Sequence, residues 1–290
     1  MTNRLIYTIE NGGVVIPIEN ATPRGFVKLA GRTGFGVAPT TLVMTEGATE
    51  GAKWRRTRRG TRTIDLPLAY FGATRDEVET KLRLLIRTLG DKKRPARLVA
   101  LYPNGRRVYA QVHYSGGLNP QYGQNADTDG QEFVKFVLTL VAPSPYWTEE
   151  TPVAYAVKAP NQGRGLLPSL SKLQVSSSQA LGTLEVNNPG DVAARPVWAV
   201  RGPGSSLMVS NGGLAFTYDY PIALDEVVTI NTVTNKVTSS VDGNVYARLA
   251  PAPKLFNIPA GMSVIDVLVP DSTAATIVNM YFNPRRELVY

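Results

Sequence analysis

The strongest constraint on the fold is a break near the middle of the chain, at residues 141–150, which read VAPSPYWTEE. The run before it, EFVKFVLTL, is typical of a β-strand. Pro143 and Pro145 remove two backbone donors and push the residue before each toward extended or turn geometry, so the strand cannot continue. Tyr146 and Trp147 are large apolar side chains with a polar edge, which suits a seam between packed units. We therefore predict a domain junction at these four residues.

The charge distribution supports the same boundary. Residues 1–147 hold 21 Lys and Arg against 12 Asp and Glu, a net charge of +9, whereas the rest of the chain holds 10 against 11, a net charge of −1. At 290 residues the chain has a length at which single cores tend to divide. We expect an N-terminal domain at 1–147, a linker or arm at 148–182, and a C-terminal domain at 183–290.

The first half combines strands with one helix, expected at about 75–89. Thr74 can cap this helix and Glu77 completes a capping box, while Gly90 offers a stop. The apolar stripe needed for packing is formed by Val78, Leu82, Leu85 and Leu89. Strand-like runs flank the helix, and the second includes a hairpin around LYPNGRR. These features predict a mainly β domain, a β-sandwich or split barrel with one α-helix.

The second half predicts an all-β domain. Its turn signals recur about every ten residues, and no segment has sustained helical periodicity. Eight runs are strand candidates: GTLEVNN, PVWAVRG, SSLMVS, LAFTYDY, EVVTIN, NKVTSS, SVIDVLVP and ATIVNMYFN. Strands this short and this evenly spaced favour a β-sandwich over an open sheet, whose edges would need cover.

Residues that could support catalysis or a metal are scarce. The chain has no cysteine and one histidine, His113, which we interpret as an ordinary strand residue. The spacing of Asp127, Asp129 and Glu132 has a weak similarity to a calcium loop, but the glycine and the final glutamate of that loop are missing. We therefore interpret the three residues as solvated loop acids. We expect no enzyme, no cofactor and no metal. The N-terminus lacks a signal-peptide core and no apolar run is long enough to span a bilayer, so we expect synthesis in the cytoplasm without membrane insertion.

The strongest local anomaly is the basic stretch KWRRTRRGTR at residues 53–62. It places six cations around one aromatic residue: Lys53, Trp54, Arg55, Arg56, Arg58, Arg59 and Arg62. Strand alternation would put Trp54, Arg56 and Arg58 on one face. We interpret the stretch as an interface with an acidic or neighbouring protein surface. Contact with a nucleic-acid backbone and a plain solvated surface remain open.

The order of several motifs resembles the distal tail protein family of long-tailed, non-contractile bacteriophages. The resemblance is carried by RDEVETKLRLLIRTLG, LYPNGRR, a strand into APSPYW, then NNPGDVAARPVWAVRGPG and a terminal YFNPRRELVY, and it covers nearly the whole chain. It implies a minor tail protein whose N-terminal domain forms a homo-hexameric ring and whose C-terminal β-sandwich is galectin-like.

The resemblance also implies a place in the virion, at the distal end of the tail. The ring would join the major tail (tube) protein to tail-tip and receptor-binding proteins, and the tape measure protein and then the genomic DNA would pass through it without specific binding. The alternative is a carbohydrate-binding module in host-surface adhesion. Against it, residues 148–290 contain no histidine, which galectins use to bind sugar, and Trp198 is expected in the core.

Overall fold

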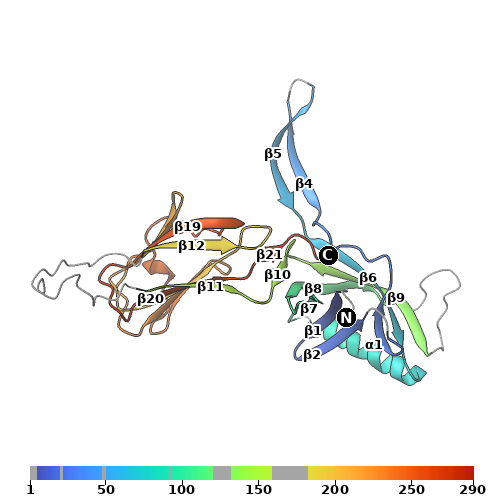
Figure 1. Cartoon of the computed structure of the whole chain (residues 1–290). Helices are drawn as coiled ribbons and strands as arrows, with labels where there is room; N and C mark the ends of the chain where they lie inside the picture. The colour runs from blue at the N-terminus through green and yellow to red at the C-terminus, as the bar shows by residue number, and fades with distance from the viewer. Residues whose placement is uncertain (1–4, 20–21, 48–49, 92, 120–131, 159–181) are drawn as a thin grey trace, which may run out of the picture. The chain divides into compact units, whose positions relative to one another are not determined.

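The computed structural model describes residues 5–19, 22–47, 50–91, 93–119, 132–158 and 182–290. The chain divides into two compact units, one made of residues 1–151 with 286–290, and the other of residues 152–285 (Figure 1). The last five residues thus return to the first unit, and the predicted C-terminal domain at 183–290 is wrong for them. The linker predicted at 148–182 is wrong for its first part, because two strands cover much of residues 147–158, and residues 159–181 lie outside the described residues.

The first unit is mainly β with one α-helix. Its elements in chain order are β1 (Ile6–Asn11), β2 (Val14–Glu19), β3 (Gly25–Lys28), β4 (Thr40–Glu46), β5 (Ala52–Arg59), β6 (Arg62–Phe71), α1 (Arg75–Leu89), β7 (Ala96–Leu101), β8 (Arg107–Gly117), β9 (Phe133–Ala142) and β10 (Trp147–Glu149). A short strand, β21 (Arg285–Arg286), follows at the end of the chain.

Seven strands of the first unit close into a barrel. The order is β8-β7-β1-β2-β3-β6-β9, and the closing contact is an antiparallel pairing of β8 with β9. The longest ladder joins β6 to β9, from Arg62 opposite Ala142 to Phe71 opposite Phe133. Strand β9 ends at Ala142, as the prolines that follow predict. The predicted arrangements were a β-sandwich or a split barrel. The structure has a closed barrel, because the pairing of β8 with β9 leaves these seven strands without a free edge.

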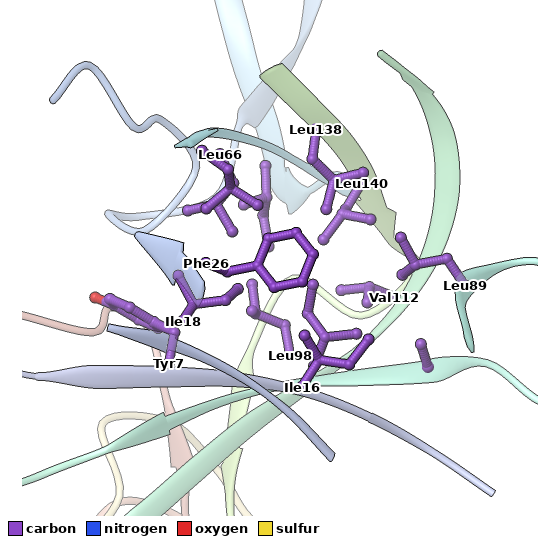
Figure 2. Packing of buried hydrophobic residues seen from close by; sticks show 14 of the residues in the cluster. Tyr7, Ile16, Ile18, Phe26, Leu66, Leu89, Leu98, Val112, Leu138 and Leu140 are labelled. Atoms are coloured by element: carbon purple, nitrogen blue, oxygen red, sulfur yellow. The ribbon is translucent and has the colours of Figure 1, made fainter. Parts of the chain in front are cut away.

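One hydrophobic core fills the first unit. Figure 2 shows Phe26 at its centre, with side chains converging on it from surrounding strands and Leu89 reaching in from the helix. The predicted helix is confirmed: Thr74 accepts a hydrogen bond from the Glu77 amide, and Val78, Leu85 and Leu89 are buried. The Glu77 carboxylate accepts a hydrogen bond from the backbone amide of Ala73 and not from that of the cap residue Thr74, so the capping box is shifted by one residue.

Trp147 belongs to this same core. Its side chain is fully buried and stacks on Phe35 with ring centroids 5.6 Å apart. The core residues around it all come from the first unit. The sequence predicts Trp147 at the junction between domains, and that role stays a prediction.

The second unit consists of two antiparallel sheets that share one core. Its strands are β11 (Val153–Lys158), β12 (Gly182–Asn188), β13 (Val197–Arg201), β14 (Leu207–Asn211), β15 (Leu214–Tyr218), β16 (Val227–Asn231), β17 (Lys236–Ser239), β18 (Gly243–Asn244), β19 (Gly261–Leu268) and β20 (Ile277–Phe282), with a 3-10 turn η1 at Tyr246–Arg248. The sheet orders are β11-β20-β13-β16-β17-β18 and β12-β19-β14-β15. Both sheets contribute to the core around Trp198, which is fully buried as expected.

A network of charges holds residues 149, 150 and 286 on the barrel. Glu150 accepts from Arg97 at 2.6 Å and from Arg107, which also pairs with Glu10 at 2.7 Å. Glu149 lies 2.8 Å from Arg286 and 3.8 Å from Arg106. Burial acts to raise the pKa of Glu150, but the hydrogen bonds from the two arginines outweigh it and lower the pKa below its ordinary value of 4.5.

This lowered pKa predicts an acid-sensitive contribution to stability. Because the pKa is lower in the folded state, the contribution is fully present above the ordinary pKa and is lost as the pH falls through the folded value. Glu150→Gln should therefore lower the free energy of unfolding by roughly 1 kcal/mol near neutral pH, since the pairs are partly exposed. Urea unfolding of both proteins checks this. A deficit that does not shrink as the pH falls below the ordinary pKa of 4.5 would contradict it.

The buried ring of Trp147 gives a second prediction. Trp147→Ala should lower the free energy of unfolding by about 3 to 5 kcal/mol, because it leaves a large cavity in the barrel core. Trp54→Ala is the matched control, since 57% of the Trp54 surface is exposed. Urea midpoints followed by circular dichroism should separate the two variants, and equal midpoints would reject the burial of Trp147 in the barrel core.

A candidate interaction surface on the β4–β5 hairpin

The basic stretch lies on a hairpin that forms a sheet of its own. Strands β4 and β5 pair with each other and with no other described strand (Figure 1). Nearly every residue of both strands is exposed. The basic run in the sequence predicts β5 as a surface strand but gives no such signal for its partner β4, which contributes half of the surface. The available signal for β4 was the run TTLVMTE, followed by a glycine-bounded turn.

A β-bulge sorts the side chains of the hairpin onto two faces. The register pairs Val43 with Arg56 but Met44 with Trp54, so Arg55 is an extra residue on β5. Cross-strand partners share a face, and successive residues of β4 alternate between faces. Trp54 therefore lies on the opposite face from Arg56. The predicted grouping of Trp54 with Arg56 and Arg58 is wrong, because the extra residue inverts the alternation between positions 54 and 56.

One face of the hairpin is apolar and exposed. It consists of Leu42, Met44 and Trp54, which are 56%, 48% and 57% exposed, and we call it the apolar face. Trp54 donates its indole N–H to the Thr57 hydroxyl at 3.1 Å, which fixes the ring over this face. Large apolar side chains grouped on one exposed sheet face are typical of a surface that another protein covers.

The other face carries the positive charge. We call Lys53, Arg55, Arg56 and Arg58 the cationic face. Arg55 joins it because its Nε donates to the Thr45 hydroxyl at 3.0 Å, and Thr45 is the partner of Lys53. Among the described residues, no carboxylate forms an ion pair with these four side chains. Arg59 differs, since it pairs with Glu287 at 2.8 Å.

A hollow of about 390 Å³ opens at the base of the cationic face. Its lining includes Arg56, Arg58 and Arg59, the threonines Thr41 and Thr61, and the apolar Val43 and Pro143. Guanidinium groups and threonine hydroxyls are donors, so the lining suits a group that accepts hydrogen bonds and carries negative charge. Pro143, predicted at the domain junction, thus also lines this hollow.

Arg62 does not belong to the exposed basic surface. Its side chain is 1% exposed, and its guanidinium donates to the carbonyls of Gly34 at 2.6 Å, Pro145 at 2.6 Å and Glu287 at 2.8 Å, and to that of Gly36. The prediction of Arg62 as an interface residue is wrong, because barrel strand β6 starts there and turns the side chain inward. Burial lowers the pKa of Arg62, and Glu287 acts in the opposite direction.

This buried guanidinium anchors the base of the hairpin. It joins the segment before β4, the start of β6, the segment after β9 and the end of the chain. Gly34 has a φ of +82°, and a Cβ there would lie 2.1 Å from the Thr63 carbonyl oxygen, so the loop can approach β6 only as glycine. The ring of Trp147 lies below the guanidinium, 5.6 Å from its carbon to the ring centroid.

The remaining predicted site residues fall in different places. Pro145 gives its carbonyl to Arg62, whereas Tyr146 is half-buried. His113 is exposed on β8. Of the three acids interpreted as solvated loop residues, Asp127 and Asp129 lie outside the described residues. Within the described ranges, no three His, Cys, Asp or Glu side chains come together as a metal site would require.

No described helix has the length and apolarity needed to cross a bilayer.

The anchor can be tested by a charge-preserving change. Arg62→Lys keeps the charge but cannot reach four carbonyls in fixed geometry, so it should lower the free energy of unfolding by about 2 kcal/mol or more. Arg56→Lys, on the exposed cationic face, is the control and should change it by less than about 0.5 kcal/mol. Urea unfolding measures both, and an Arg62→Lys protein as stable as the control would contradict the anchor.

Comparisons with known proteins give matches in structure only. No protein-family model matches the sequence, and no curated protein matches it. Among solved structures, the Dit protein of phage SPP1 matches with a TM-score of 0.65 and 11% identity, over 96% of this chain and 98% of that one. That structure is described as a paradigm of the hub adsorption apparatus in phages that infect Gram-positive bacteria.

A chain in the structure of the phage P2 baseplate, in its activated conformation with Ca, matches with a TM-score of 0.54 and 12% identity. The match covers 99% of this chain and 100% of that one. At such identities the comparison establishes the fold alone. The resemblance to distal tail proteins is confirmed at that level: the chain has, over nearly its whole length, the fold of phage hub and baseplate proteins.

Proposed function

We propose that this protein is a structural, non-enzymatic component of a phage tail tip, a distal tail protein. Copies of it would form a six-membered ring that joins the tail tube to the tail-tip and receptor-binding proteins. The observation that carries the proposal is the full-length fold match to hub and baseplate proteins, which includes both units of the chain. A fold does not by itself determine function, so the proposal also needs support from the surface of the chain.

The hairpin provides this support. A closed ring needs contacts in which one surface of a subunit meets a different surface of the next. The apolar face of Leu42, Met44 and Trp54 is exposed in the single chain and belongs to a sheet whose two strands pair with no other strand in the described part of the chain. Burying such a face on a neighbouring copy would remove apolar area from water and cover edges that otherwise invite aggregation.

The proposal predicts an assembly that depends on the apolar face. Light scattering of the purified protein should give a mass near six chains, and negative-stain images should show rings with a central hole. Leu42→Ser/Trp54→Ser should shift the mass to that of one chain, because most binding energy in an interface comes from a few apolar and aromatic anchors.

Val15→Ser/Ile86→Ser is the matched control, since both side chains are at least half exposed on other elements of the first unit. It should leave the mass unchanged. A wild-type chain that stays monomeric both alone and after mixing with tail-tube protein would contradict the ring. Rings that form equally well from the hairpin variant would contradict the role of the apolar face.

A further inference from the structure

The two faces of the hairpin differ too much in chemistry to meet the same kind of surface. The apolar face suits the neighbouring copy of the proposed ring. The cationic face presents four positive side chains that no described carboxylate neutralises. Its arginines also border a hollow into which an acceptor group can enter.

We propose that the cationic face is a docking site for an extended acidic segment of a different protein, whose carboxylates bind Arg56 and Arg58 and enter the hollow. The statement that this partner is a tail component rests on the proposed function. The statement that the partner is acidic rests on the charge of the cationic face alone. Arg56 and Arg58 point to the same side two positions apart, about 6.6 Å along the strand. Alternate residues of an extended peptide have the same spacing, so two carboxylates can meet two guanidinium forks.

A second copy of this chain does not fit the cationic face. Residues 1–147 carry a net charge of +9, and the rest of the chain carries −1, so neither part is strongly acidic. Like charge across an interface is unfavourable and lowers the rate of association. The complementary surface must therefore come from a chain with a local excess of Asp and Glu.

A nucleic acid fits less well than an acidic peptide. Proteins that hold single strands combine cations for the phosphates with aromatic rings on which the bases stack. The bulge places Trp54 on the face opposite Arg56 and Arg58, so one strand cannot reach both. Arg56 and Arg58 have no aromatic ring beside them on their face, so they suit the carboxylates of a peptide better than a nucleic-acid strand.

The test uses a fluorescent peptide of about ten residues in which Glu and Ser alternate, because this spacing matches same-side strand positions. Binding to the full chain is measured by anisotropy at low ionic strength, where exposed charges are least screened. Arg56→Gln/Arg58→Gln should weaken binding by at least about tenfold. Arg83→Gln/Arg87→Gln removes the same charge from the exposed side of α1 and should weaken it by less than about twofold.

Three results would overturn the proposal. The first is a wild-type chain that binds the Glu-Ser peptide no more tightly than a Gln-Ser peptide. The second is an equal loss of binding in both double variants, which would mean attraction by net charge. The third is an oligothymidylate of the same length that binds as tightly and loses binding with Arg56→Gln/Arg58→Gln, which would mean a nucleic-acid site.

The experiments distinguish a failure of the acidic docking site from a failure of the proposed function. Arg56→Gln/Arg58→Gln should still form rings, whereas Leu42→Ser/Trp54→Ser should lose rings and still bind the acidic peptide. A chain that binds the peptide but forms no ring would remove the proposed function and leave the acidic docking site standing. A chain that forms rings but does not bind the peptide would remove the acidic docking site and leave the proposed function standing.

Discussion

The buried guanidinium of Arg62 is the interaction on which the arrangement of the first unit depends. It donates to carbonyls of Gly34, Gly36, Pro145 and Glu287, which belong to three segments far apart in sequence. A buried arginine is costly unless each donor is satisfied, so these segments must meet there together. The hairpin leaves the barrel between the first of these segments and Arg62 itself. The surface proposed for assembly is therefore positioned by the same contact that brings the end of the chain back to the barrel.

The hairpin gains its two kinds of surface from one extra residue. Without the bulge at Arg55, Trp54 would share a face with Arg56 and Arg58, and the hairpin would present one mixed face of charge and aromatic surface. With it, apolar and cationic side chains are separated by the thickness of a two-stranded sheet. A thin hairpin with two different faces can contact two different partners at once, which is what a protein placed between a tube and a tail tip requires under the proposed function.

Local signals in the sequence predicted much of the fold. The helix at 75–89 follows from its cap and apolar stripe, and all eight strands expected in the second half are present. What the sequence did not reveal depends on contacts between distant residues. Pairing of β8 with β9 closes the barrel, and Val289 lies in the core of the first unit although it is nearly the last residue. Strand β11 was taken for a linker because its alternation is short. Arg62 was grouped with its exposed neighbours because charge runs carry no information on where a strand turns inward.

The most direct test of the account is a photo-cross-link from the apolar face. The chain contains no cysteine, so Leu42→Cys provides a unique site for a thiol-reactive photoactivatable probe. Irradiation of the assembled protein should give a ladder of products up to six chains, with the cross-linked peptide in the first unit of a neighbouring copy. Products confined to single chains, from a sample whose scattering mass is that of an oligomer, would contradict the claim that the hairpin joins one subunit to the next.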